Sequence, residues 1–101
     1  MKRRADTALD RMRDRLRDGP GELDDAVRRA ALEGGEVPSA AAGLVDKIRR
    51  RAYAVTDEDV KGTQRETGWS DSQLFELVVA TAVGEGLRRR AVIDRLLEGG
   101  S

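Results

Sequence analysis

The sequence contains no cysteine and no histidine. Without cysteine the chain forms neither disulfides nor thiolate metal ligands, and without histidine it lacks the commonest zinc ligand and general base. These two absences exclude peroxide and disulfide chemistry and a Ser-His-Asp triad. No glycine-rich phosphate-binding loop is present either, so we expect no cofactor and no metal.

Aromatic residues and long apolar runs are also scarce. The chain has one Trp, one Tyr and one Phe. Its longest apolar run, 77–83, is broken by Thr81 and is far shorter than the ~20 residues needed to cross a bilayer. The N-terminus is charged and has no apolar stretch typical of a secretion signal. We therefore expect a cytoplasmic protein with no membrane partner.

The chain carries no net charge, because nineteen basic residues balance nineteen acidic ones. Such a balance argues against a surface built throughout to attract nucleic acid. Arg nevertheless outnumbers Lys sixteen to three, with basic runs in "MKRRADTALDRMRDRLR" and "KIRRRAYAV". Because arginine suits phosphate recognition, nucleic-acid binding through the N-terminal arginines stays open beside the alternative of solvated helix surfaces.

The apolar residues that are present recur at intervals of three and four, and no segment alternates as a strand would. We therefore predict one all-α domain, a small bundle of about five helices. A charged N-terminal hairpin over 1–35 would precede a helical core over 40–98. The predicted helices cover residues 3–18, 22–33, 40–54, a short segment between Thr56 and Gly68, and 71–99.

Capping signals mark the start of the last helix. Ser70 is followed three residues later by Gln73, the pattern of a capping box in which each side chain binds a backbone N–H of the other residue. The helix is therefore predicted to begin near Asp71.

A second capping signal precedes the fourth helix. Thr56 is typical of an N-cap, and the acidic residues after it favour the positive end of a helix. Asp57, Glu58 and Asp59 are also oxygen donors for a hard cation, but successive helical residues point in different directions. The sequence therefore favours a capped helix start over a metal site, with Gly68 ending the helix.

The last helix is apolar on nearly every side. Eleven of the twenty-two Leu, Ile, Val and Phe residues lie between Leu74 and Leu97, which predicts that this quarter of the chain forms the core. On a helix they make two apolar seams, and the narrow, Ala-rich faces of the other helices suffice to cover one. We therefore predict that the second seam meets another copy of the chain. The predicted interface residues are Leu74, Phe75, Leu77, Val78, Val79, Ala82, Val83, Gly84 and Leu87.

Two glycines interrupt this helix. Gly84 and Gly86 each cost ~1 kcal/mol of helix propensity relative to Ala. Such a cost indicates either a close approach by a neighbouring helix or a bend at this point.

Three residues are candidates for chemistry. Glu85 lies between the two glycines, where burial could make it a proton-transfer group, and Arg88 could hold an anionic substrate beside it. An ion pair between Glu85 and Arg88 or Arg89 is the alternative. Tyr53 is the third candidate, and its alternative role is an anchor in the core or an interface.

The order of these parts resembles a known family. The segment from Leu44 to Arg90 reads "LVDKIRRRAYAVTDEDVKGTQRETGWSDSQLFELVVATAVGEGLRRR". It is similar to the C-terminal part of the alkylhydroperoxidase D-like and carboxymuconolactone decarboxylase superfamily: a helix ending in Ala-Tyr, a Val-Thr-Asp-Glu-Asp-Val helix start, a Gly-Trp-Ser-Asp turn, and a long apolar helix with Arg88. The resemblance covers nearly half of the chain.

The resemblance implies an all-α fold that assembles into dimers, trimers or hexamers. The chain departs from the family in lacking its Cys-X-X-Cys pair and nearby His, and in having Gly84 and Leu87 where the family commonly has Asn. It therefore resembles a short member of the superfamily that has the helical scaffold but lacks the thiols.

Three functions follow as expectations. The first, which we favour, is a noncatalytic self-associating helical protein, an accessory or assembly subunit of an enzyme. The second is a thiol-independent lyase or isomerase of the carboxymuconolactone decarboxylase type, acting on a small anionic substrate. The third is nucleic-acid binding. A pocket enclosing Glu85 and Arg88 would favour the enzyme, whereas a dry interface over the same helix would favour the first function.

Overall fold

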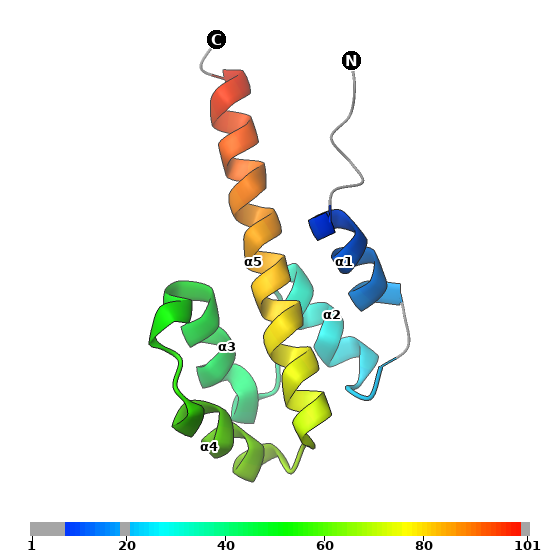
Figure 1. Cartoon of the computed structure of the whole chain (residues 1–101), viewed down its shortest axis with the longest axis vertical. Coiled ribbons are helices and arrows are strands. Elements are labelled where there is room, and N and C mark those ends of the chain that lie inside the picture. The colour runs from blue at the N-terminus through cyan, green and yellow to red at the C-terminus, as the bar shows by residue number, and fades with distance from the viewer. Residues whose placement is uncertain (1–7, 19–20, 100–101) are drawn as a thin grey trace.

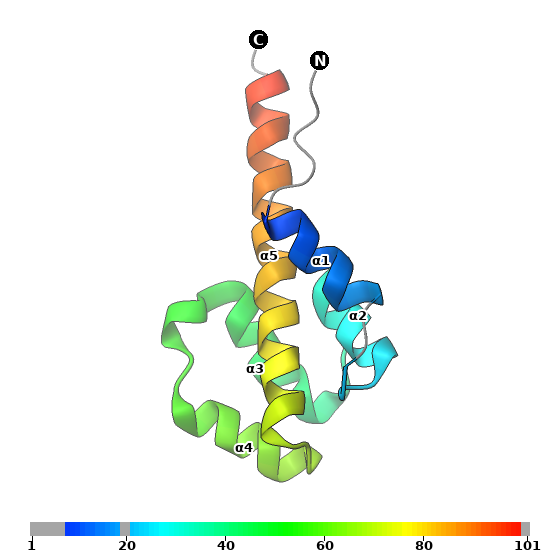
Figure 2. The same cartoon turned by 45° about the vertical axis from the view of Figure 1, so that its right-hand side comes forward.

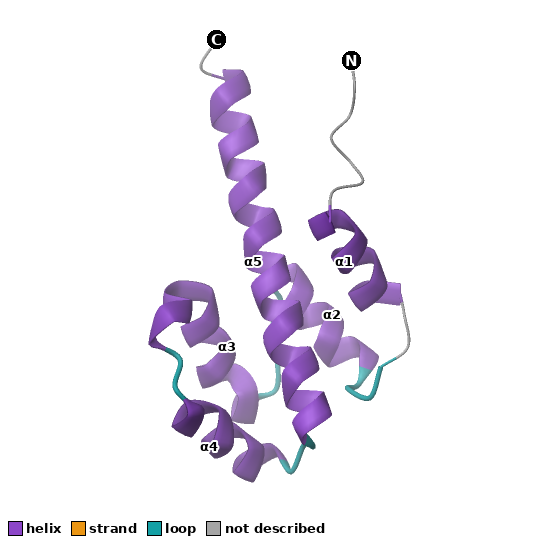
Figure 3. Cartoon of the chain, viewed as in Figure 1, coloured by secondary structure: helices purple, strands orange, loops and turns teal. Residues whose placement is uncertain are grey.

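The computed structural model describes residues 8–18 and 21–99, and these residues form helices and loops with no strand (Figure 3). The prediction of an all-α chain is therefore confirmed. Residues 3–7, which were predicted to begin the first helix, lie outside the described part. The helices are α1 (Ala8–Asp18), α2 (Asp25–Glu33), α3 (Ser39–Arg51), the 3₁₀ helix η1 (Ala52–Ala54), α4 (Asp57–Thr67) and α5 (Asp71–Gly99).

Helix α5 is the central element of the fold. It runs between α1 and α2 on one side and α3 and α4 on the other (Figures 1 and 2). Its most extensive packing is with α2. With 29 residues it is more than twice as long as α2 or α3, so its C-terminal part extends beyond the other helices.

One hydrophobic core joins α2, α3 and the first half of α5. The segment 1–35 therefore shares its core with 40–98 through α2. In the last quarter of the chain the fully buried core residues end at Val83, the half-buried Leu87 packs against the core, and the apolar residues after Arg90 are exposed. The buried apolar residues are Leu23, Ala31, Leu32, Ala41, Leu44, Val45, Ile48, Leu74, Leu77, Ala80 and Val83.

The capping predictions around α4 and α5 are confirmed. Thr56 Oγ1 accepts a hydrogen bond from the backbone N–H of Asp59 at 3.2 Å, and the Asp59 carboxylate accepts one from Thr56 N–H at 2.9 Å. Ser70 and Gln73 form the same reciprocal pair, at 3.1 and 2.7 Å. Gly68 ends α4 in the left-handed region, with φ 75°.

Two other helix boundaries differ from the predictions. Helix α2 begins at Asp25 rather than residue 22, because the Asp24 side chain caps it by accepting from Ala26 N–H at 2.8 Å. Helix α3 ends at Arg51, and the residues to Ala54 form η1. In η1 the Tyr53 side chain is 87% exposed, so it is not a core anchor.

The glycine at position 84 lies where α5 crosses α2. A Cβ atom there would overlap the carbonyl oxygen of Leu32 and lie 2.9 Å from its carbonyl carbon. The predicted close approach is therefore confirmed, and the neighbour is a helix of the same chain. Helix α5 continues through Gly84 and Gly86 without a break.

Candidate functional site

The candidate catalytic residues Glu85 and Arg88 form an ion pair on α5. Arg88 Nη2 lies 2.6 Å from Glu85 Oε2, and Arg88 Nε donates to the same oxygen at 3.2 Å. Arg88 Nη1 donates to the carbonyl oxygen of Leu32 at 3.3 Å, near the C-terminus of α2, where a cation is favoured by the helix dipole. The guanidinium therefore links α5 to α2 and is already occupied by protein groups.

The surface beside this ion pair is an open depression of about 450 Å³. It is lined by Glu85, Arg88, Arg89, Val92 and Ile93, all from α5. Tyr53 does not line it, so the structure does not bring the three candidate catalytic residues together. A depression formed by one helix does not enclose a small substrate, whereas its apolar part can pack against another protein surface.

The nine predicted interface residues fall into two groups. Leu74, Leu77, Val83 and Gly84 are buried by the chain's own helices and have little surface left for a partner. The other five keep accessible surface. Phe75 is 69% exposed and Ala82 is exposed, while the remaining three are half-buried: Val78, Val79 and Leu87.

Three of these five accessible residues, Phe75, Val79 and Ala82, belong to a longer, mostly apolar stripe on α5, which we call the outward seam. Its members alternate at spacings of four and three residues, which places them on one side of a helix, as in a coiled-coil seam. Gly86 and Val79 are half-buried and the other members are exposed. The outward seam consists of Phe75, Val79, Ala82, Gly86, Arg89, Ile93 and Leu96.

The last two members of the outward seam, Ile93 and Leu96, lie on the part of α5 that extends beyond the bundle, residues 91–98, which we call the overhang (Figure 1). Ile93 is 55% exposed, Leu96 69% and Leu97 73%. Our sequence-based interface ended at Leu87 and omitted these residues. The spacing that continues from Phe75 to Leu96 was the signal that could have included them.

A second apolar depression, of about 290 Å³, lies at the opposite end of α5. It lies between α4 and α5 and includes the Phe75 side chain. Its lining residues are Val60, Gln64, Asp71, Leu74, Phe75 and Val78.

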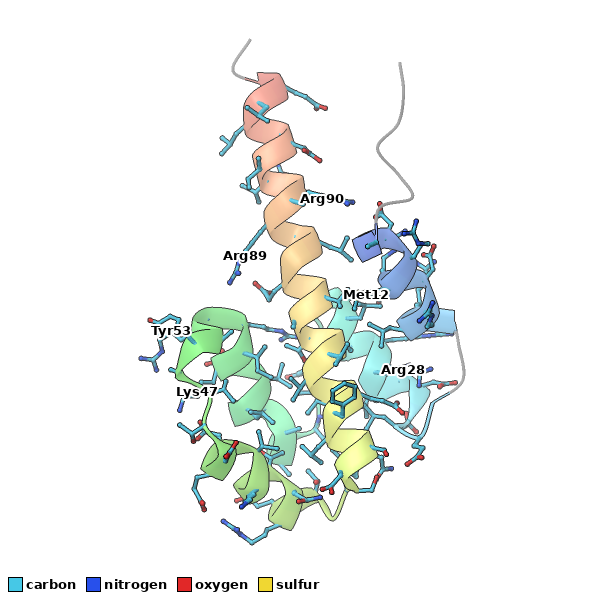
Figure 4. The ribbon with its side chains drawn as sticks, viewed as in Figure 1. Met12, Arg28, Lys47, Tyr53, Arg89 and Arg90 are labelled. Carbon is cyan, nitrogen blue, oxygen red and sulfur yellow. The ribbon has the colours of Figure 1, made fainter. Side chains whose placement is uncertain are left out.

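Arg89 is the one charged member of the outward seam. It is exposed and forms no hydrogen bond or ion pair with the described residues. Its neighbour Arg90 leaves the opposite side of α5 (Figure 4) and binds Asp10 of α1, with Nη2 2.9 Å from Oδ1. The hydrogen bonds with Asp10 raise the pKa of Arg90 above its usual range. Arg90 therefore joins α1 to α5, whereas Arg89 faces solvent.

Other arginines also stabilise the fold. Arg28 is buried, and its guanidinium donates to the Leu16 carbonyl and to Asp25, with Nη2 2.6 Å from Oδ1. Arg49 Nη2 donates to the carbonyl oxygens of Ala30 and Gly35, at 3.2 and 3.1 Å. Arg28 and Arg49 therefore join segments of the fold through backbone carbonyl groups, a role that the sequence did not predict.

Glu76 has a structural role that the sequence did not reveal. Its carboxylate accepts hydrogen bonds from the backbone N–H groups of Glu22 at 2.8 Å and Leu23 at 3.0 Å. Arg28 Nη1 lies 3.7 Å from the same carboxylate. Glu76 thus attaches the segment before α2 to α5, a contact between residues more than fifty positions apart that no local pattern indicates.

The acidic first turn of α4 makes internal contacts. Lys47 Nζ lies 2.8 Å from Asp59 Oδ2, and this hydrogen bond, followed by that from Thr56 N–H, lowers the pKa of Asp59 below its usual value. Among the described residues no group of three or more acidic side chains is placed to hold a metal ion.

Comparison of the chain with protein-family models, curated proteins and solved structures finds no match. The resemblance to the alkylhydroperoxidase D-like superfamily therefore stays a prediction. Within residues 8–18 and 21–99, no helix is both long and apolar enough to cross a membrane.

Proposed function

We propose that this protein is a noncatalytic helical subunit that self-associates through the outward seam of α5. The observation that supports the proposal most directly is the exposure of this seam. Three of the seven large apolar residues that are exposed in the described chain, Phe75, Ile93 and Leu96, belong to this seam. Exposed apolar residues aligned on one side of a helix are typical of a protein interaction site.

The overhang is needed for such an interface to be stable. Covering a large apolar side chain fully is worth ~1.5–3 kcal/mol, and roughly half of that for a side chain already half covered. The four large apolar residues of the outward seam, Phe75, Val79, Ile93 and Leu96, taken from each of two copies give on the order of 10 kcal/mol, against an association cost of ~4–15 kcal/mol. An interface that left out the overhang would lose about half of this gain.

The residues of this sequence that the structure does not describe have too few apolar side chains to cover the outward seam. The residues that are not described are 1–7, 19–20 and 100–101, and their only apolar members are Met1, Ala5 and Pro20. These residues supply too little apolar surface to cover Ile93, Leu96 and Leu97. A second copy supplies a matching seam of the same length.

The lyase or isomerase alternative has less support than self-association. It requires Glu85 and Arg88 to meet a substrate, yet both side chains already bind each other, and the depression beside them is open. The apolar residues that line this depression, Val92 and Ile93, suit a protein contact. A scaffold of the alkylhydroperoxidase D-like type and an accessory role beside an enzyme are parts of the same proposal, and both rest on the sequence resemblance.

The proposal is tested by measuring mass in solution with substitutions on the overhang. Ile93→Asp buries a carboxylate in the proposed interface, so we expect the dissociation constant to rise at least about a hundredfold. Val79→Asp should split the assembly or prevent folding, because Val79 is half-buried and also packs against the core. Ala91→Asp is the matched control, because Ala91 is exposed on the overhang but is not a member of the outward seam.

Sedimentation velocity over a range of concentrations gives the mass, and circular dichroism reports whether each variant keeps its helices. Wild type and Ala91→Asp should associate, and Ile93→Asp should be a folded monomer. A wild-type chain that stays monomeric at every concentration contradicts the proposal, as does an Ile93→Asp variant that associates like the control.

A further inference from the structure

We infer that two copies pack with their α5 helices antiparallel, so that Arg89 of each copy lies beside Asp71 of the partner subunit. This inference rests on the proposed self-association. It assigns the orientation of the pair and an intermolecular ion pair that completes the seam.

The position of Arg89 in the outward seam decides the orientation. In a parallel pair, equivalent residues of the two seams meet, so the two Arg89 side chains would face each other inside an apolar interface. Like charges brought together and partly desolvated oppose association. In an antiparallel pair the two Arg89 side chains lie far apart, and each meets the N-terminal half of the partner's helix.

An acidic residue lies where the antiparallel pair requires one. Asp71 and Arg89 are eighteen positions apart, which is five helical turns, so both lie on the same side of α5. Asp71 is exposed, and among the described residues its carboxylate accepts one hydrogen bond, from Gln64 Nε2 at 2.8 Å. It therefore has acceptor capacity left for a guanidinium.

The same pairing matches large residues with small ones. When Arg89 lies opposite Asp71 of the partner subunit, the centre of the crossing falls near residue 80. Val79 then faces Ala82 of the partner subunit, and the Phe75 ring faces Gly86 of the partner subunit. Val79 and Phe75 thus each meet a small member of the seam, which allows the two helices to approach closely.

In this arrangement the overhang of each copy also packs against a surface of the partner. Antiparallel packing carries Ile93 and Leu96 of one copy toward the N-terminal end of the partner's α5. The depression between α4 and α5, with Val60, Leu74 and Phe75 in its lining, lies at that end. In a parallel pair this depression would stay open to solvent, and the two overhangs would cover only each other.

The orientation is tested by disulfide trapping, for which the absence of cysteine gives a clean background. Two single-cysteine variants, Asp71→Cys and Arg89→Cys, replace exposed side chains that lie opposite each other in the antiparallel pair. The two are made with different masses, mixed and oxidised. Ala91→Cys, on the overhang but off the seam, is the negative control.

The expected product of the mixture is the mixed disulfide, with little covalent dimer from either variant alone. Equivalent positions at residue 89 would be ~27 Å apart in the antiparallel pair, whereas a disulfide needs Cα atoms within about 7 Å. A covalent dimer of Arg89→Cys alone would show a parallel pair and overturn the inference. An assembled dimer that forms no disulfide between residues 71 and 89 would overturn it too.

Sedimentation of the unoxidised proteins distinguishes a failure of the orientation from a failure of self-association. If they are dimers with the wrong disulfide pattern, the orientation fails and self-association stands. If wild type and both variants are monomers, self-association fails and the orientation fails with it.

Discussion

Gly84 of α5 and Leu32 of α2 meet backbone to backbone, with no room for a side chain between them. The same Leu32 carbonyl accepts a hydrogen bond from Arg88, one turn further along α5. The crossing of α2 and α5 is therefore fixed by a missing Cβ atom at one residue and a guanidinium at the next turn. It also decides which side of α5 faces inward.

Substitution of Gly84 by Ala should be destabilising. The new methyl group would overlap the Leu32 carbonyl, and both atoms belong to helices that cannot move without disturbing the core. We expect Gly84→Ala to lower the free energy of unfolding by ~2–4 kcal/mol, measured by urea denaturation.

Gly43 provides the matched control for this substitution. It lies inside α3, is exposed, and a Cβ atom there would meet nothing within 4 Å. Gly43→Ala should raise the free energy of unfolding by ~0.5–1 kcal/mol through helix propensity alone. Equal effects at the two positions would show that propensity, and not the close approach, sets the cost at Gly84.

The Ser70 cap is expected to stabilise the start of α5. Its hydroxyl accepts from Gln73 N–H at 3.1 Å, so Ser70→Ala should cost ~1 kcal/mol. Ser72→Ala, two residues further along and exposed, should change the free energy of unfolding by less than about 0.5 kcal/mol. Urea denaturation of both variants measures the difference, and a Ser70→Ala variant as stable as Ser72→Ala would show that the cap is not needed.

The contact between Lys47 and Asp59 should make stability depend on pH in the acid range. The pKa of Asp59 is lowered in the folded chain, first by the hydrogen bond from Lys47. Between the lowered value and the unfolded value of about 4, the unfolded chain binds more protons. Stability from this group is therefore fully present above about pH 4 and is lost as pH falls through the folded pKa.

Asp59→Asn tests this dependence by removing the titration while keeping the shape of the side chain. The thermal midpoint of wild type should exceed that of Asp59→Asn at pH 7, and the gap should shrink below about pH 4. Asp57→Asn controls for loss of an acidic residue in the first turn of α4, because Asp57 makes no hydrogen bond or ion pair with the described residues. A gap that is constant with pH would contradict the assignment to Asp59.

Local features were readable from the sequence because they depend on neighbours in the chain. The caps at Thr56 and Ser70 and the end of α4 at Gly68 each involve residues within four positions of one another, and all were predicted. The start of α2 was misplaced by three residues. Glu22 and Leu23 bind the Glu76 carboxylate instead of opening the helix, and that partner is more than fifty positions away.

The orientation of α5 needed the tertiary structure. The sequence alone determined that this helix is apolar on two sides, since the spacing of its residues fixes their angles around the axis. It did not determine which side the other helices cover, because both sides offer similar apolar side chains. Contact with α2 at Gly84 decided that, and it left Phe75 outside the core. The tertiary structure also decided that Ile93 and Leu96 are exposed, because the helices beside α5 end before they reach them.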